Sequence, residues 1–167
     1  PGAVEVTPDV EWARIAPVLQ GILQARSDAV VSIDTRHAAT AEKALQAGAK
    51  IINDVSGLEF EKSMAEIIAR YHAGCILTHS TGIPEVMQKN GTVIAGNTLE
   101  IVKTALQNIV DNASAAGISS GRIMLDVGIC FGKTRKGNYE LLNHAGNLEK
   151  EFALPFCWGV SRKSLLK

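Results

Sequence analysis

The segment LDVGICFGKTRKGN, residues 125–138, combines an acidic residue with the glycines, lysine and threonine of a phosphate-binding loop. A P-loop requires Gly, four other residues, then Gly-Lys followed by Ser or Thr. Counted back from Gly132-Lys133-Thr134, the first Gly would fall on position 127, which is Val, and Gly128 is one residue too close. The spacing excludes a P-loop, so Lys133 is expected only to flank the loop. Asp126, at the end of an apolar run, is the candidate for the chemistry.

Apolar runs and amphipathic segments alternate along the chain, which predicts how Asp126 is positioned. The runs predict strands over 29–35, 49–57, 75–80, 122–128 and 155–161. The segments between them predict helices over 36–48, 60–74, 98–117 and 138–152, with Gly48 as the C-terminal cap of the first. Strands separated by helices of this size are typical of parallel βαβ units. A loop over 81–97 is long enough to suggest function.

Polar residues stand where each predicted strand ends. They are Asp34, Asn53-Asp54, Thr78-His79, Asp126 and Ser161-Arg162-Lys163. In parallel α/β folds the carboxyl ends of the strands lie on one side of the sheet, and ligands bind there. A single such residue is more often a cap of the following helix. Their recurrence at every predicted strand favours a shared site.

Length, charge and cysteine content limit the class of protein. The 167 residues fit one domain, and 17 basic against 17 acidic residues give a formal net charge of zero. Neither nucleic acid nor an acidic membrane is therefore attracted at long range. There is no apolar stretch of ~18 or more residues and no secretory signal, so neither a membrane span nor export is expected. Cys75, Cys130 and Cys157 are far apart, which favours reduced thiols in a cytoplasm.

Three segments together resemble the dihydropteroate synthase family of folate biosynthesis in their order and spacing. They are VSIDTRHAATAEKALQAGAKIINDVSG (31–57), LDVGICFGKT (125–134) and GVSRKS (159–164), and LTHSTGIPEVMQ (77–88) is similar to the family's segment after the fifth strand. The resemblance covers essentially the whole chain. It implies a parallel (β/α)8 TIM barrel of the pterin-binding type, with about five βα units present as one partial domain over 1–167. The first two strands of the barrel and its last strand have no counterpart.

The resemblance implies a reaction and its partners. The family joins p-aminobenzoate to 6-hydroxymethyl-7,8-dihydropterin pyrophosphate and releases pyrophosphate, with Mg²⁺ as cofactor. The protein ligand of that magnesium has no counterpart in this chain. The expected protein is a cytoplasmic homodimer and a sulfonamide target that binds small molecules but no nucleic acid or membrane.

By the same resemblance, Asp126 and Lys163 carry the catalysis. Asp126 would accept hydrogen bonds from the amino and ring N–H groups of the pterin and stabilise the cation formed as pyrophosphate leaves. Lys163 would reach the acceptor side of the pterin, and Gly159 would allow its close approach. Asp34 and Asn53 would contact other polar atoms of the pterin.

The remaining candidates belong to the second substrate or to the rim of the site. Phe131 would line the p-aminobenzoate channel, and Ser164, at a helix start, would meet the substrate carboxylate. Thr78, His79 and Arg162 are further site candidates, although a structural hydrogen bond suits His79 equally well. His37, His72 and His144 lie in helical segments and are expected at the surface.

Simpler interpretations remain open for several residues. Asp34 could belong to a helix cap, Asn53 could be a turn residue, and Lys163 could be a solvated charge. A methyltetrahydrofolate–corrinoid methyltransferase domain and a non-catalytic pterin-binding remnant are the alternative functions. The SRKS segment, 161–164, argues against the methyltransferase.

The chain departs from the family pattern at three positions. The usual Asp-Pro-Gly-Ile-Gly-Phe is here Asp126-Val127-Gly128-Ile129-Cys130-Phe131. Val127 frees the φ angle that Pro would fix. Cys130 replaces a Gly, a residue that can adopt backbone angles that are costly for other residues, and the change is expected to shift the loop that carries Phe131. Thr78 stands for a usual Met, which weakens the expected apolar packing against the pterin.

Overall fold

The computed structural model describes residues 6–81, 96–163 and 165. Its strands are β1 (Ser32–Asp34), β2 (Ile51–Asp54), β3 (Gly74–Thr78), β4 (Ile123–Asp126) and β5 (Phe156–Cys157). They form one parallel sheet in which the spatial order is the chain order, as predicted. Ser164 and most of the loop predicted over 81–97 lie outside the described residues.

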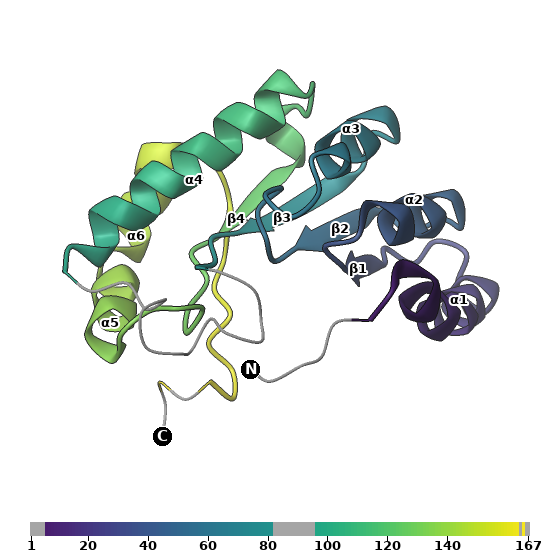
Figure 1. Ribbon diagram of the computed structural model, residues 1–167, viewed down its shortest axis with the longest axis horizontal. Coiled ribbons are helices and arrows are strands. Elements are labelled where there is room, and N and C mark those ends of the chain that lie inside the picture. Colours follow the sequence, from purple (N-terminus) through teal and green to yellow (C-terminus); the bar gives the residue numbers. More distant parts are fainter. Residues whose placement is uncertain (1–5, 82–95, 164, 166–167) are drawn as a thin grey trace.

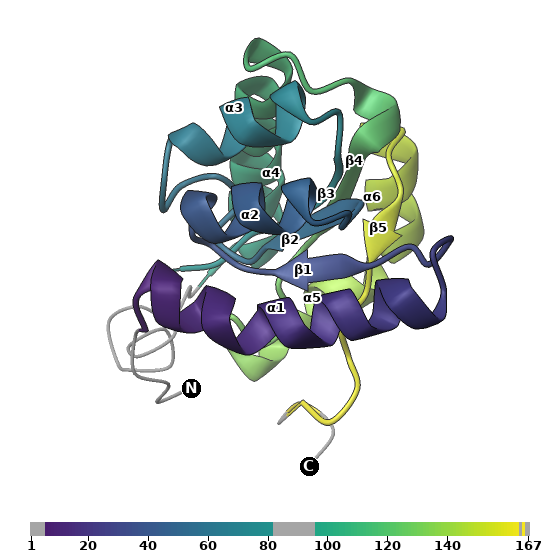
Figure 2. The same cartoon turned by 90° about the vertical axis from the view of Figure 1, so that its right-hand side faces the viewer.

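Helices cover one side of this sheet. They are α1 (Pro8–Ala25), α2 (Ala38–Gln46), α3 (Ser63–Arg70), α4 (Thr98–Ala115), α5 (Arg135–Asn143) and α6 (Ala145–Phe152), and a short 3₁₀ turn, η1 (Ser120–Arg122), precedes β4. Figure 1 shows α1 to α4 and α6 in an arc outside the strands. The helix α1 packs beside α2 at the β1 end of the sheet (Figure 2). Alternating strands and outer helices are the (β/α) architecture that the sequence predicts.

The helix α1 is absent from the predicted elements, although its start carries clear signals. Thr7 is the N-cap, and its side chain accepts a hydrogen bond of 3.4 Å from the Val10 N–H. Pro8 occupies the first turn, and Asp9 and Glu11 complement the positive end of the helix. The apolar stripe is weak, since Leu19 is the one residue of the helix that is buried. A pattern search that depends on periodicity therefore misses it.

The helix predicted over 138–152 is wrong as a single element. It is two helices, α5 and α6, which meet at His144. The His144 Nδ1 lies 2.8 Å from the Glu140 carbonyl oxygen, and the His144 N–H donates to the Leu141 carbonyl. The chain turns there because these contacts replace the regular ladder of the helix.

The strand β2 ends earlier than predicted because Asp54 folds the following residues into a turn. Its carboxylate accepts hydrogen bonds from the Ser56 N–H (2.8 Å), the Ser56 hydroxyl (2.6 Å) and the Leu58 N–H (2.9 Å). Asp54 is 1% exposed. Burial raises the pKa of its carboxyl, and these hydrogen bonds lower it by a smaller amount. Asp54 is thus a structural residue and does not join the shared site predicted from the strand ends.

The two faces of the sheet differ in character. Alternate strand residues are buried under the helices, and they are Ile33, Ile52, Cys75, Leu77, Ile123 and Leu125. The opposite face carries Asp34, Asn53, Ile76, Met124 and Asp126, all of which are half-buried except the exposed Asp34. Because side chains alternate along a strand, the polar residues at the strand ends share this second face.

Two predictions about single residues differ from the structure. The C-cap of α2 is Ala47 rather than the predicted Gly48, which follows it with a φ of 109°, the left-handed region that ends the helix. His37 is buried rather than at the surface, so that prediction is wrong. Its Nδ1 lies 3.1 Å from the Glu61 carboxylate, whose other oxygen accepts from the Ala38 N–H at the start of α2. A buried polar side chain needs such a partner.

Candidate active site

The strand register brings four of the predicted residues to one end of the sheet. Asp34 of β1 is aligned with Asn53 of β2, and the Asn53 side chain makes a hydrogen bond with Asp34. Thr78 of β3 is aligned with Asp126 of β4, two residues nearer the carboxyl end than the level of Asn53. Burial raises the pKa of the Asp34 carboxyl, the Asn53 contact opposes this shift, and the Glu11 charge adds to it.

Asp126 is held by the backbone of its own loop. The Gly128 N–H donates to Asp126 Oδ1 at 2.7 Å, and the His79 N–H donates to the Asp126 backbone carbonyl at 2.9 Å. Burial raises the pKa of the Asp126 carboxyl, while the Gly128 hydrogen bond and the charges of Lys163 and Lys133 oppose the shift. The carboxylate is fixed through one oxygen, and its second oxygen lies toward Gly159 and Lys163.

Lys163 completes the site from the segment after β5. Its Nζ donates to the Ile129 carbonyl oxygen at 2.6 Å and lies 4.5 Å from the centre of the Phe131 ring. A Cβ atom on Gly159 would lie 3.4 Å from Lys163 Nζ and 3.7 Å from Asp126 Oδ2. Gly159 therefore keeps the space between the carboxylate and the ammonium open. The structure thus brings Asp126, Gly159, Lys163 and Phe131 together from two loops.

Lys133 is the residue whose prediction is most clearly wrong. It does not merely flank the loop, since it is 5% exposed and its Nζ donates to the carbonyl oxygens of Gly128 (2.9 Å), Phe131 (3.1 Å) and His79 (3.2 Å). Burial lowers the pKa of Lys133 to about 7, against the opposing charge of Asp126. The only sequence signal was its place in the same turn as Asp126, just before the helix cap Thr134.

Gly128 is required where β4 passes close to the end of β3. Its φ is 67°, and a Cβ atom there would lie 2.0 Å from the His79 carbonyl oxygen. His79 itself is buried, and its Nδ1 has no hydrogen-bond partner among the described residues. Burial and the Lys133 charge lower the pKa of His79 to about 3, so its imidazole is neutral near pH 7.

The loop after β4 is further held by Asn138, which the sequence analysis does not single out. Asn138 is 2% exposed; its Oδ1 accepts from the Cys130 N–H at 2.7 Å and its Nδ2 donates to the Thr134 carbonyl at 2.8 Å. Cys130 has a φ of 66°, the left-handed conformation that the family's glycine adopts without strain. Val127 and Ile129 are fully buried and anchor the same loop in the core.

The other candidates differ in placement. Thr78 is buried. Arg162 is exposed in a turn with a φ of 57°, and its part in the site stays a prediction. Cys157, missed by the sequence analysis, is aligned with Asp126 across β4 and β5, and burial raises the pKa of its thiol. None of the three cysteines is in a disulfide.

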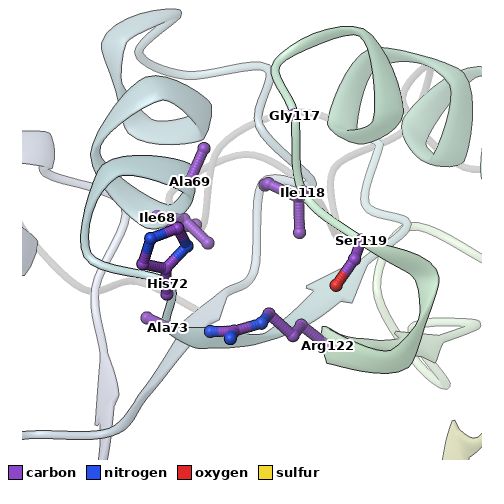
Figure 3. A pocket seen from close by; sticks show the side chains of 8 residues that line it. All are labelled: Ile68, Ala69, His72, Ala73, Gly117, Ile118, Ser119 and Arg122. Atoms are coloured by element: carbon purple, nitrogen blue, oxygen red, sulfur yellow. The ribbon is translucent and has the colours of Figure 1, made fainter.

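A cavity of about 160 Å³ lies beside the amino ends of β3 and β4, where Ala73 and Arg122 line it (Figure 3). It is lined by the C-terminal end of α3, the turn after α4, and His72 and Arg122. Both helices end there in left-handed residues, His72 and Gly117.

The described part of the chain contains no cluster of three or more His, Cys, Asp or Glu side chains that could hold a metal ion. Mg²⁺ is commonly held by only one or two carboxylates together with substrate phosphates, so magnesium stays a prediction. No described helix is both long and apolar enough to cross a membrane.

Comparison with known proteins identifies the family to which this chain belongs. The family model "Pterin binding enzyme" matches residues 1–167, so the chain belongs to the pterin-binding enzyme family. Its relatives include dihydropteroate synthases. That of Clostridium beijerinckii is 36% identical over 166 residues, and that of Neisseria meningitidis serogroup C is 38% identical over 168 residues. These alignments cover 99% of this chain but only 58% and 57% of the two relatives.

Solved structures agree with this assignment. Dihydropteroate synthase from Anaplasma phagocytophilum with bound 6-hydroxymethylpterin-monophosphate superposes with a TM-score of 0.91 at 35% identity, over 99% of this chain and 65% of that one. The Yersinia pestis enzyme in a sulfonamide drug complex superposes with a TM-score of 0.90 at 35% identity, over 99% and 58% of the two chains. The chain is therefore a five-stranded part of the same parallel barrel.

Proposed function

We propose that this chain carries the pterin site of a dihydropteroate synthase, which joins p-aminobenzoate to 6-hydroxymethyl-7,8-dihydropterin pyrophosphate. The observation that carries the proposal is that the Asp126 carboxylate and the Lys163 ammonium both border the space left by Gly159. A pterin presents N–H donors and ring acceptors on neighbouring edges, and this pair offers an acceptor and a donor. The names of the relatives support the same substrate class.

The proposed mechanism uses the residues of the site to orient the pterin and to stabilise charge. Asp126 accepts from the N–H groups of the pterin, and Lys163 donates to an acceptor atom of the ring. The carbon–oxygen bond to pyrophosphate breaks, and the pair of electrons leaves with the pyrophosphate. The Asp126 carboxylate stabilises the delocalised cation. The amino nitrogen of p-aminobenzoate then forms the new carbon–nitrogen bond and loses a proton to solvent.

The second substrate is assigned to the Phe131 side of the site. The Phe131 ring lies against Lys163 and offers an apolar surface for the aromatic ring of p-aminobenzoate. A sulfonamide would compete for the same place, which the sulfonamide complex of the Yersinia pestis relative supports. Mg²⁺ dependence, a homodimer and a cytoplasmic location are part of the same proposal.

The test is release of pyrophosphate by the purified protein. We expect release to require both the pterin pyrophosphate and p-aminobenzoate, and to be inhibited by a sulfonamide. Methyl transfer from methyltetrahydrofolate to cobalamin would instead identify the corrinoid methyltransferase. Pterin binding with neither activity would identify a non-catalytic pterin-binding protein.

A further inference from the structure

Lys133 joins the ends of two neighbouring strands through its side chain alone. It lies in the loop after β4, and one of its three acceptors, the His79 carbonyl, belongs to the end of β3. The other two acceptors, the Gly128 and Phe131 carbonyls, lie at the two sides of the turn that it closes. The three contacts are between 2.9 and 3.2 Å, so the amine is fully engaged in holding backbone.

Every group that the proposed function assigns to the ligand in this part of the site is attached to the same turn. The Gly128 N–H holds Asp126, the Ile129 carbonyl holds Lys163, and Phe131 presents its ring to Lys163. A shift of the turn would therefore move the acceptor, the donor and the aromatic surface together. All three hydrogen bonds of the Lys133 ammonium end on backbone carbonyls. Lys133 therefore has no N–H donor left for a ligand in the space beside Gly159.

The charge state of Lys133 decides whether these contacts can coexist. An ammonium has three N–H donors, which matches the three carbonyl acceptors. A neutral amine has two donors and a lone pair, and that lone pair would face one of the carbonyl oxygens. One of the three backbone carbonyls would then lose its hydrogen bond to Lys133 in a largely buried setting, which is unfavourable.

We propose that Lys133 is a positioning residue whose ammonium sets the shape of the 127–132 turn, so that pterin affinity depends on the charge of a group that does not touch the pterin. This inference rests on the proposed function. The charged and titratable groups that face Lys133 are Asp126 from β4, Lys163 from the segment after β5, His79 directly after β3, and Cys130 from its own loop.

The expected titration lies in an accessible pH range. Burial lowers the pKa of Lys133 to about 7, whereas the pKa of His79 is lowered to about 3. His79 therefore keeps one charge state between pH 6 and 9. Pterin affinity is expected to be highest at pH 6 and to fall as pH rises and Lys133 loses its proton.

The experiment compares pterin binding across that pH range in matched variants of the protein. The probe is 6-hydroxymethylpterin, titrated calorimetrically from pH 6 to 9. Lys133→Met keeps an unbranched side chain that is one atom shorter and removes its donors. Lys133→Arg keeps a permanent charge, and Lys136→Met is the control at an exposed lysine in the first turn of α5. Folding of each variant is checked by circular dichroism.

We expect wild type and Lys136→Met to lose affinity at least fivefold between pH 6 and 9. Lys133→Met should bind at least tenfold more weakly at pH 6 and show no further fall, and Lys133→Arg should recover part of the affinity with a flat profile. Equal affinities and parallel profiles in wild type and folded Lys133→Met would overturn the proposal.

A second measurement separates this proposal from the proposed function. Amide hydrogen exchange of residues 127–132 is measured without ligand, and we expect faster exchange in Lys133→Met than in Lys136→Met. If no variant binds the pterin, the proposed function fails. Unchanged exchange in Lys133→Met would then reject the positioning role as well, and faster exchange would support it.

Discussion

Replacing Asp126 by asparagine tests the central residue of the site with the smallest change in shape. Asp126 Oδ1 already accepts from the Gly128 N–H at 2.7 Å, and an amide oxygen can keep that hydrogen bond. The amide nitrogen must then take the place of Oδ2, on the side of Gly159 and Lys163. It would present two N–H donors to the N–H donors of the pterin and to the Lys163 ammonium.

The expected loss of pterin affinity follows from this geometry. One charge-assisted hydrogen bond to the ligand disappears, and a buried donor of the pterin is left opposite another donor. Together these effects cost about 2–4 kcal/mol of binding free energy. At about 1.4 kcal/mol for each factor of ten, the dissociation constant rises roughly 30-fold to 700-fold. Turnover should fall further than binding, because the carboxylate also stabilises the cation of the transition state.

The fold should tolerate the change. Burial raises the folded-state pKa of the Asp126 carboxyl above its ordinary value of 3.8, so any stability from the protonated form is lost as pH rises through that folded-state pKa. At pH 7 the ionised group is a buried charge, and asparagine removes it. We therefore expect the free energy of unfolding of Asp126→Asn at pH 7 to equal or exceed that of wild type.

The assay is calorimetric titration of 6-hydroxymethylpterin into wild type, Asp126→Asn and Asp111→Asn, together with urea unfolding. Asp111 is an exposed acidic residue of α4 and controls for loss of one negative charge. A folded Asp126→Asn with wild-type affinity would refute the assignment of Asp126 to the pterin. Equal losses in both variants would show that only long-range charge matters.

Three further changes have expected outcomes that urea unfolding can measure. Gly128→Ala should lower the free energy of unfolding by about 2–5 kcal/mol, since its Cβ meets the His79 carbonyl and its φ is positive; a smaller loss would mean that the turn can move. Cys130→Gly should raise the free energy of unfolding by about 0.5–1 kcal/mol. The change relieves the strain of a left-handed non-glycine residue, and the greater flexibility of glycine in the unfolded chain offsets part of that gain. A lower stability would contradict strain at this position. The pKa of Lys133, about 7 in the folded state, lies below its ordinary value of 10.5, so the unfolded chain binds more protons between these pH values. The free energy of unfolding of wild type should therefore increase relative to that of Lys133→Met as pH rises from 7 to 10. A difference that stays constant over this range would contradict the shifted pKa.

The sequence alone determined the layout of the sheet and the end at which the site lies. Apolar runs alternating with helical segments require parallel βαβ units, and polar residues such as Asn53 and Asp126 at the strand ends must then lie at one edge. The order and spacing of a few motifs were also enough to identify the family. These features depend on chain neighbours and on the handedness and periodicity of secondary structure, which a sequence carries directly.

Only the tertiary structure decided which polar residues gather at the candidate site and which ones support the surrounding backbone. Asp54 follows Asn53 directly, yet its side chain lies on the buried helix side of the sheet, and its carboxylate accepts hydrogen bonds from the following turn. Lys133 resembles a surface lysine of a loop until β3 and β4 lie side by side and surround it with three carbonyl groups. Burial and hydrogen-bond partners arise from segments far apart in the chain, so charge state and role change only when packing brings those segments together.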